Sequence, residues 1–547
     1  MKKTLFELSG NIVDVVGQRI FKGTLVIQDG KIAEVREEPV TSDQYILPGL
    51  VDAHIHVESS MLIPSEFARL AVAHGTVATV SDPHEIANVL GIPGVKFMIE
   101  NGKKVPFKFF FGAPSCVPAT PFETAGAHLG IAEVEELLRM EEVKYLSEMM
   151  NFPGVLSKDK EVLAKLELAK NAGKPVDGHA PGVKGENARR YIQAGISTDH
   201  ECYTKEEAIE KIAYGMKILI REGSAAKNFE ALCSLMDEFP HMVMLCSDDK
   251  HPNDLAIGHI NELVIRALDK GYDLMKILRS CTYNPVRHYK LEVGLLQQGD
   301  PADCIVVDDI HEFRIRETYI DGIKVAANGK TLIQSVNETP YNNFNIDLIQ
   351  KSELEVRPEG TNIKVQKALD GQLITELIHA APRIEGNNVV SDPDRDVLKL
   401  VVKNRYFNAP AALGFIGNIG LKNGALASCV AHDSHNIVAV GTDDASIAKA
   451  INLIIEAKGG ISLVDGIQEI ILPLPFAGIM SGEDAYFIAK KYDWLDKKAK
   501  EMGCTLSAPY MTLSFMALLV IPALKLSDKG LFDGNQFSFT EIFEKNE

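Results

Sequence analysis

Hydrophobic and polar positions alternate differently in three parts of the 547-residue chain. Residues 4–40 alternate short apolar and polar runs around Asp29-Gly30, a dipeptide typical of tight β-hairpin turns. A similar pattern returns between residues 303 and 333. We therefore expect segments 1–48 and 295–335 to pair into one small β-domain, although a long stretch of chain separates them.

Residues 49–294, between these segments, alternate apolar runs with amphipathic stretches, a pattern typical of a parallel sheet with crossover helices. Thr204 with Glu207 fits a capping box at a helix start, and Asn228 fits a helix N-cap. The apolar runs predict eight strands, at 47–56, 76–82, 107–115, 145–151, 175–179, 196–200, 218–223 and 243–248. Eight strands alternating with helices predict an α/β fold, the (β/α)8 TIM barrel.

Residues 345–547 mix alternating strands with two amphipathic helices, at 445–458 and 484–502, and indicate a separate C-terminal α+β domain. The polar, turn-rich stretch 337–343 fits a linker before it. The domain contains the cluster His432, Asp433 and His435. We expect this cluster to satisfy the hydrogen bonds of a local turn, with a further metal site or a place at the barrel mouth as alternatives.

Polar residues follow the carboxyl ends of the predicted barrel strands, where the chemistry of such barrels is located. His54 and His56 end the first strand and point the same way, because side chains two apart on a strand share a face. Later strand ends carry Asp82, His84, Glu85, Glu148, His179, His200, Glu201, Asp248 and Asp249. Histidines and carboxylates in one mouth form a ligand set for two divalent cations, and residue types alone do not choose between manganese, iron and zinc. Residues 82–85 also fit an acidic helix N-terminus.

Composition narrows the range of partners. The chain has 57 Lys and Arg against 75 Asp and Glu, a net charge of -18, which argues against binding to nucleic-acid phosphates. No apolar run reaches the ~18 residues of a membrane helix, and the first ten residues do not form a signal peptide. The eight cysteines contain no C-x-x-C pair and fit reduced thiols. We expect a cytoplasmic protein that binds a small molecule and has neither a nucleic-acid nor a membrane partner.

Several motifs carry a resemblance to a known family. Asp52-Ala-His-Ile-His56, followed in order by His179, His200 and Asp248, resembles the amidohydrolase superfamily over about residues 1–330. The motifs at 81–89, 177–182, 197–202 and 247–251, with Cys429-Val-Ala-His-Asp-Ser-His-Asn436 downstream, are similar to the adenine deaminase family. Glu148 lies near the end of the fourth strand and Lys144 at its start, so Glu148 is the better bridging candidate. This departure weakens a hydantoinase or dihydroorotase assignment, in which a carboxylated lysine bridges the metals.

The resemblance implies hydrolytic deamination of adenine to hypoxanthine and ammonia by a metal-bridged hydroxide, a step of purine salvage. Two divalent cations are expected, manganese first, with iron or zinc as alternatives. The implied metal ligands are His54, His56, Glu148, His179, His200 and Asp248.

Asp248 is the predicted proton carrier. Glu85 is favoured over Glu201 as the acid that reaches the purine ring, and Asp82, His84 and Asp249 are predicted to bind substrate. We also expect a homo-oligomer. The alternatives are another amidohydrolase that cleaves a cyclic amide or C–N bond, and an inactive barrel kept as a scaffold.

Overall fold

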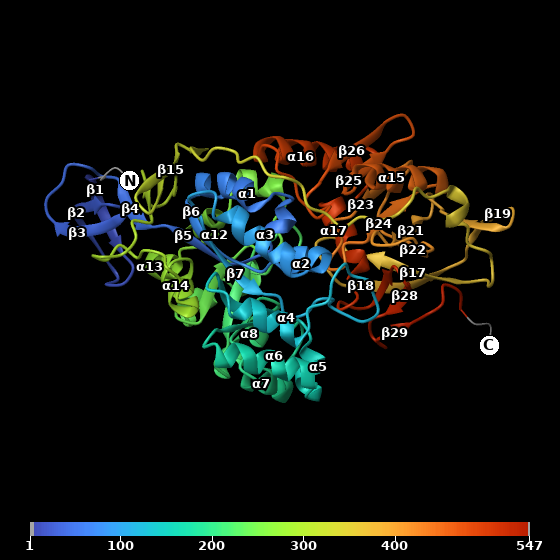
Figure 1. Cartoon of the computed structure of the whole chain (residues 1–547), viewed down its shortest axis with the longest axis horizontal. Helices are drawn as coiled ribbons and strands as arrows, with labels where there is room; N and C mark the ends of the chain where they lie inside the picture. Colours follow the sequence, from blue (N-terminus) through green and yellow to red (C-terminus); the bar gives the residue numbers. More distant parts are fainter. Residues whose placement is uncertain (1–4, 545–547) are drawn as a thin grey trace.

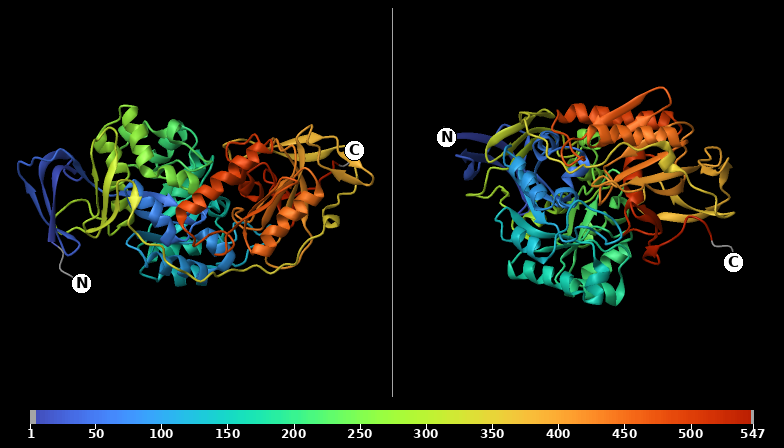
Figure 2. Two further views of the ribbon diagram at one scale, coloured as in Figure 1. Left: turned by 90° about the horizontal axis from the view of Figure 1, so that it is seen from above. Right: turned by 45° about the vertical axis from the view of Figure 1, so that its right-hand side comes forward.

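Three bodies lie in a row in the computed structural model, which describes residues 5–544 (Figure 1). A β-domain occupies one end, a barrel the centre and the C-terminal domain the other end. Two further views show that the C-terminal domain packs against the barrel on the side away from the β-domain (Figure 2). The barrel therefore lies between the β-domain and the C-terminal domain.

Eight parallel strands form the central barrel. The sheet β5-β6-β7-β8-β9 joins the sheet β10-β11-β12 where Ser197 N donates to Val176 O at 2.9 Å. The barrel closes between β12 and β5, because Asp248 N donates to His54 O at 2.9 Å and His56 N donates to Asp248 O at 3.2 Å. The strands are β5 (Leu50–Ile55), β6 (Thr76–Ser81), β7 (Lys108–Ala113), β8 (Val143–Met149), β9 (Val176–Gly178), β10 (Thr198–Asp199), β11 (Lys217–Arg221) and β12 (Val243–Cys246).

Helices cover the outside of the barrel. They are α1 (Pro64–Ala71), α2 (His84–Leu90), α3 (Ile92–Gly102), α4 (Ile131–Leu138), α5 (Phe152–Ser157), α6 (Lys160–Asn171), α7 (Gly185–Gln193), α8 (Lys205–Ala213), α9 (Phe229–Leu232), α10 (Leu235–Glu238), α11 (Pro252–Ile257), α12 (Ile260–Asp269), α13 (Leu274–Ser280) and α14 (Tyr283–Tyr289). The 3-10 turns η1 (Val57–Ser60) and η2 (Val72–His74) lie on either side of α1. Because apolar side chains fill the space between strands and helices, the polar strand ends are the part of the barrel left for chemistry.

The structure confirms the predicted barrel and corrects three local expectations. The first predicted strand is two strands, since β4 (Tyr45–Pro48) belongs to the β-domain and only β5 to the barrel. Thr204 caps α8, accepting the amide of Glu207 at 3.3 Å, but the Glu207 side chain accepts from Lys211 at 2.9 Å, so one half of the predicted capping box is present. Asn228 makes no capping bond, because its side chain accepts from Arg221 N at 2.8 Å and donates to His200 O at 3.0 Å.

One eight-stranded sheet, in the order β16-β15-β14-β13-β4-β1-β2-β3, forms the β-domain. Strand β13 pairs antiparallel with β4, so segments from both sides of the barrel share the sheet. Asp29 (φ 49°) and Gly30 (φ 83°) make the hairpin turn between β2 and β3. The remaining strands are β1 (Leu5–Asp14), β2 (Arg19–Gln28), β3 (Lys31–Glu37), β13 (Cys304–Val307), β14 (Ile315–Ile320), β15 (Ile323–Ala327) and β16 (Lys330–Thr331).

A second eight-stranded sheet, in the order β18-β17-β22-β21-β24-β23-β25-β26, is the frame of the C-terminal domain. Its elements are η3 (Lys351–Leu354), β17 (Ile363–Ala368), β18 (Thr375–Ala380), β21 (Val397–Lys403), β22 (Ala412–Gly417), β23 (Ala425–Ser428), β24 (Ile437–Gly441), α15 (Asp444–Ala457), β25 (Gly460–Val464), β26 (Glu469–Pro473), α16 (Ala485–Glu501), α17 (Pro509–Ser514) and η4 (Phe515–Ala517). Smaller pairings involve β19 (Arg383–Glu385), β20 (Asn388–Val390), β27 (Leu524–Ser527), β28 (Gly530–Asp533) and β29 (Ser538–Phe539).

The C-terminal domain is joined to the barrel by backbone bonds as well as by apolar packing. Ser481 N donates to Met61 O at 2.8 Å, and Ile63 N donates to Ser481 O at 3.0 Å. One continuous cluster of buried apolar side chains extends from the barrel into this domain. The segment that follows β5, around Met61 and Ile63, is therefore bonded directly to the C-terminal domain.

Within residues 5–544, no helix combines the length and hydropathy needed to cross a membrane. All eight cysteines are buried and free.

The buried Arg405 holds the predicted linker against the C-terminal domain. Its guanidinium donates to Asn342 Oδ1 at 2.8 Å, to Ala477 O at 2.7 Å and, less closely, to His435 O at 3.4 Å. The linker is thus bonded in place rather than loose.

We expect Arg405→Met to lower the apparent Tm by roughly 5 °C or more, since carbonyls buried around the guanidinium lose their donors. Thermal unfolding followed by circular dichroism measures the change. Arg395→Met is the matched control, because Arg395 lies at the surface beside Asp392. Equal Tm values for the two variants would contradict the anchoring role of Arg405.

Candidate active site

The six predicted metal ligands meet at the carboxyl end of the barrel. His54 belongs to β5 and His56 follows it, Glu148 belongs to β8, and His179, His200 and Asp248 follow β9, β10 and β12. All six are buried, and none is more than 8% exposed. Ionisable groups shielded this well from water need partners of opposite charge or a bound cation.

Glu148 lies at the centre of the ligand cluster. Its Oε1 is 3.5 Å from His56 Nε2, and its Oε2 is 3.0 Å from His179 Nδ1 and 3.1 Å from His200 Nε2. The two oxygens of one carboxylate therefore face histidines from different strands. Glu148 would therefore be able to hold a cation with either of its oxygens.

Asp248 follows β12, the strand that lies beside β5 where the barrel closes. Its Oδ1 lies 3.2 Å from His56 Nε2 and 3.5 Å from His54 Nε2. Both ring nitrogens of His54 are buried and have no hydrogen-bond partner within residues 5–544, although Nε2 points at the carboxylate of Asp248. Nitrogen and oxygen donors this close together, some without a hydrogen-bond partner, fit divalent cations, and the groups His54–His56–Asp248 and His54–Glu148–His200 are each close enough to hold one.

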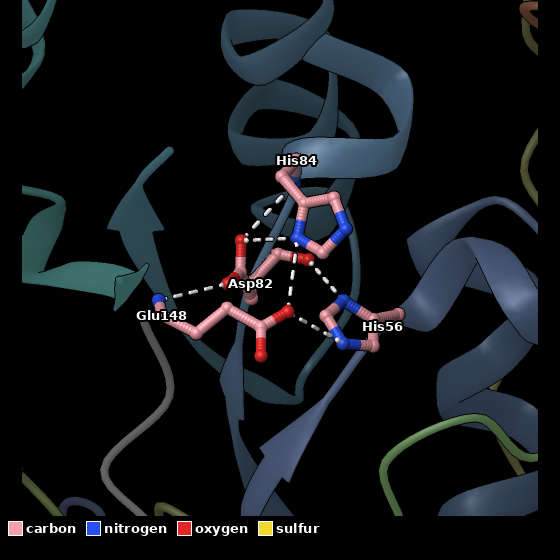
Figure 3. Close-up of side chains that lie close together, drawn as sticks. All are labelled: His56, Asp82, His84 and Glu148. Atoms are coloured by element: carbon pink, nitrogen blue, oxygen red, sulfur yellow. Dashed lines mark hydrogen bonds and ion pairs between the residues drawn. The ribbon is translucent and has the colours of Figure 1, made fainter. Parts of the chain in front are cut away.

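Asp82 and His84, predicted to bind substrate, lie inside the same cluster (Figure 3). His84 Nδ1 is 3.4 Å from Glu148 Oε1, and Asp82 Oδ2 accepts the amide of Glu148 at 3.2 Å. His56 Nδ1 lies 3.2 Å from the backbone oxygen of Asp82. Since His84 opens α2, with Glu85 in its first turn, the segment is both a helix start and part of the site. The geometry favours ligand or positioning roles for these two residues.

Arg221 is a residue of the site that our sequence analysis missed. Its Nη1 donates to Asp248 Oδ2 at 2.7 Å, and its Nη2 donates to Glu201 Oε2 at 2.9 Å. The side chain is fully buried. A signal was available, because Arg221 is the polar residue at the carboxyl end of the seventh strand, the position from which the other candidates came.

The Arg221 guanidinium keeps two carboxyl groups of the site ionised. Burial alone would raise the pKa of Asp248, but Arg221 and then His200 outweigh burial and hold that pKa well below its usual range. The pKa of Glu201 is likewise lowered against the effect of burial, by Arg221 and by His179. Glu201 Oε1 lies 3.5 Å from both His179 Nδ1 and His200 Nε2. In the free protein both carboxylates therefore accept protons rather than donate them.

Asp52 lies two residues before His54 on β5 and joins this strand to the loop that carries Asp248. Its Oδ1 accepts the amides of Ser247 at 3.0 Å and His54 at 3.2 Å, and its Oδ2 faces His259 Nε2 at 2.8 Å. One buried carboxylate thus ties β5 to the loop that carries Asp248. Such contacts behind ligands fix their orientation.

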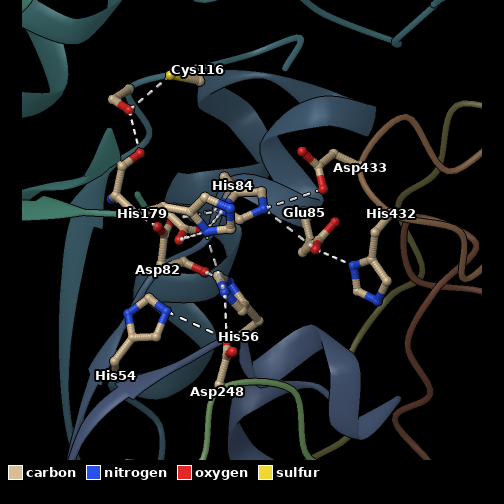
Figure 4. Close-up of polar contacts among 12 residues, drawn as sticks. His54, His56, Asp82, His84, Glu85, Cys116, His179, Asp248, His432 and Asp433 are labelled. Atoms are coloured by element: carbon tan, nitrogen blue, oxygen red, sulfur yellow. Dashed lines mark hydrogen bonds and ion pairs between the residues drawn. The ribbon is translucent and has the colours of Figure 1, made fainter. Parts of the chain in front are cut away.

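His432, Asp433 and His435 reach the barrel mouth, which was one of our alternatives. The expected bonds of a local turn are present as well, since Ala431 N donates to His435 Nδ1 and His435 N donates to Ala431 O. His432 Nδ1 contacts one oxygen of Glu85, and Asp433 Oδ1 lies 3.8 Å from His84 Nε2 (Figure 4). His435 Nε2 contacts the other oxygen of Glu85. Packing of the C-terminal domain on the barrel brings them there. The same packing adds apolar side chains to the cavity above the ligand cluster, namely Leu373, Phe515, Leu518 and Val520.

Lys525 ties two parts of this apolar roof together. Its buried ammonium donates to Leu373 O at 2.7 Å and to Phe515 O at 2.9 Å. Burial lowers the pKa of Lys525 to about 7. The backbone of both roof segments is therefore fixed from behind by one side chain.

Glu85 and Asp249 line the cavity in different electrostatic states. Burial would raise the pKa of Glu85, but His432 and His435 outweigh burial and hold it well below its usual range. Burial raises the pKa of Asp249, whose Oδ1 accepts a hydrogen bond from Ser59 Oγ at 2.5 Å. The predicted site residues thus lie together, and all of them except His54 and Asp82 line one cavity. Glu85 and Glu201 have cationic partners there, His432 and Arg221.

Fold and site together define a metal-dependent hydrolase of the barrel type, and comparison with known proteins agrees. Residues 45–333 match the amidohydrolase family model, and residues 372–538 match the model for the adenine deaminase C-terminal domain. Relatives named adenine deaminase include those of Sulfurovum sp. (55% identical, 98% of this chain and 99% of the relative), Methanosarcina acetivorans (53%, 99% and 100%) and Borreliella burgdorferi (47%, 98% and 100%). The chain therefore belongs to the amidohydrolase family and, within it, to the adenine deaminases.

We expect Glu148→Gln to lower bound divalent metal by at least half, because an amide removes the negative charge that faces three histidines at the cluster centre. Metal per chain is measured by inductively coupled plasma mass spectrometry after growth with manganese. Glu142→Gln, at the surface beside Lys103, is the control and should keep the wild-type content. Full metal occupancy in Glu148→Gln would contradict the central role of Glu148.

Proposed function

We propose that this chain hydrolyses adenine to hypoxanthine and ammonia at the barrel mouth. The observation that carries the proposal is the pairing of a buried histidine–carboxylate cluster with a roof supplied by the segment that matches the adenine deaminase C-terminal domain. The relatives that align over nearly the whole chain are named for this reaction. The site is lined by side chains suited to a small polar ring.

The proposed cofactor is a pair of divalent cations, manganese first, with iron or zinc as alternatives. The proposed ligands are His54, His56, Glu148, His179, His200 and Asp248, with Glu148 between the two positions. When bound, the cations would lower the pKa of a water molecule enough to supply a hydroxide nucleophile near neutral pH.

The chain's own carboxylates move the two protons of that water. A C6–O bond forms as hydroxide adds to adenine, and the C6–N bond to the amino group breaks. Asp248, held ionised by Arg221, accepts a proton from the attacking oxygen and passes it to the amine, which leaves as ammonia. The other proton of the water ends on ring nitrogen N1 of hypoxanthine.

Glu201, rather than Glu85, is the better carrier of the proton that reaches N1. Both oxygens of Glu85 are engaged by His432 and His435 of the C-terminal domain. Both oxygens of Glu201 are engaged as well, by Arg221, but its Oε1 also lies 3.5 Å from His179 Nδ1 and His200 Nε2, next to the proposed metal ligands. Glu201 begins ionised, so it can accept a proton before donating it. Our expectation that Glu85 serves as the ring acid stays the alternative to this assignment.

Two alternative functions, a cyclic-amide hydrolase and an inactive scaffold, fit the arrangement of residues less well. Hydrolysis of a cyclic amide by a lysine-bridged centre is not favoured, because Lys144 lines a groove with Glu141 and Glu142 and is not in the ligand cluster. An inactive scaffold has no need of the full ligand set that is gathered here. A cytoplasmic homo-oligomer in purine salvage remains a prediction, and the free cysteines fit a reducing compartment.

The direct test is ammonia release from adenine, beside adenosine, cytosine and dihydrouracil, by protein grown with manganese. We expect ammonia from adenine and about two metals per chain, as for a binuclear hydrolase. Removal of metal with a chelator should abolish the activity, and added manganese should restore it. If the metal-loaded protein releases no ammonia from adenine, the substrate assignment is wrong.

We expect Asp248→Asn to reduce kcat about 10²- to 10⁴-fold, the usual contribution of a general acid–base group. Metal content is measured on the same sample, which separates lost proton transfer from lost metal. Asp269→Asn, exposed at the end of α12, is the control. Near-normal turnover with metal bound would remove Asp248 from its role.

A further inference from the structure

The inference concerns His432 and rests on the proposed function. Glu85, at the barrel mouth, receives one hydrogen bond from each of two histidines of the C-terminal domain, His432 through Nδ1 and His435 through Nε2. A carboxylate oxygen can only accept, so each of these ring nitrogens carries a proton. Both oxygens of Glu85 are therefore used within the protein.

His435 faces Glu85 in a fixed tautomer. The amide of Ala431 donates to His435 Nδ1 at 3.2 Å, so Nδ1 carries no proton and Nε2 does. A ring in this state donates through Nε2 and has no lone pair there for a cation. Although Glu85, His432 and His435 are close enough together to resemble a metal site, the bonding around His435 argues against one. The role of His435 is to position Glu85.

His432 has one ring nitrogen left over. Its Nδ1 is held by Glu85, while its Nε2 is buried and has no hydrogen-bond partner among the described residues. The imidazole stacks on Phe515, with ring centroids 4.8 Å apart and planes 17° apart, which fixes the direction of Nε2. The side chain is 2% exposed and lines the same cavity as His56, Glu148 and Asp248.

Burial would lower the pKa of His432, but Glu85 and Asp249 outweigh burial and raise it to about 9, so Nε2 carries a proton as well as Nδ1. We propose that His432 Nε2 donates a hydrogen bond to a ring nitrogen of the bound purine, which makes the C-terminal domain part of the substrate site. A buried polar atom without a partner is destabilising, and a ligand that supplies the partner gains affinity. Purines present ring nitrogens along their edges, and the Phe515 stack holds the imidazole rigid. Glu85 and His435 act as positioning residues that set the orientation of His432.

Two substitutions of His432 distinguish the role of its Nδ1 from the role of its Nε2. The amide of Asn overlays Nδ1, so His432→Asn keeps a group beside Glu85 and removes Nε2. The longer Gln overlays Nε2, so His432→Gln keeps a group facing the cavity and removes the Glu85 contact. His379→Gln, in the same domain but at the surface beside Glu544, is the control.

The readouts are kcat and KM for adenine, metal per chain, and calorimetric affinity for unsubstituted purine, which has the ring but no amino group to lose. We expect His432→Asn to lower kcat/KM about 10- to 100-fold, mostly through KM, and to weaken purine binding by a similar factor. His432→Gln should lose less than His432→Asn, and His379→Gln should match the wild type. Metal content should be unchanged in all three.

Each contrary outcome has one meaning. Wild-type affinity for purine in His432→Asn would overturn the contact, and so would failure of the metal-loaded wild type to bind purine. Loss of one metal in His432→Asn would assign Nε2 to a cation instead and also overturn it. A wild type that binds purine through His432 but releases no ammonia from adenine would leave the contact standing and overturn the proposed function.

Discussion

The structure of this site depends on a carboxylate, Glu148, that is buried among imidazoles from several barrel strands. An ionised carboxyl group without water or a cationic partner is very costly in a protein interior. Here the charge of Glu148 is met by His179 and His200 on one oxygen and by His56 on the other. Each of these histidines needs its backbone held to within a fraction of an ångström. A closed barrel supplies that rigidity, because every strand is bonded on both sides.

The same electrostatic constraint explains the residues around the ligands. Arg221 pairs with Asp248 and Glu201, so the negative charge of the site is partly compensated even without a cation. Asp52 joins β5 to the loop of Asp248 through backbone amides and His259. None of these contacts lies at the surface, where solvent would weaken them. The polar residues behind the ligands therefore form a network in which most members have a partner, as a buried site requires.

How far the sequence could predict this arrangement depends on the range of each interaction. His54 and His56 follow from the two-residue repeat of a strand, and Glu148, His179 and Asp248 follow from the rule that parallel strands end at one edge. Those inferences need only local periodicity. Glu85 and His432 are 347 positions apart, and nothing in the pattern near either residue indicates that they touch. Asn228 shows the reverse case, because a good local capping signal was overridden by bonds to Arg221 and His200.

The roof follows from the way in which the C-terminal domain is held. Leu373 and Phe515 are far apart in the chain, yet Lys525 bonds the backbone oxygen of each, so the two segments form one surface over the cavity. Phe515 in turn stacks on His432, and His432 contacts Glu85 on the barrel. A chain of direct contacts thus runs from the hairpin of β27 and β28 to the second barrel loop. The domain that lacks the main metal ligands therefore fixes the shape of the space in which the barrel residues act, and this makes the site a property of both domains.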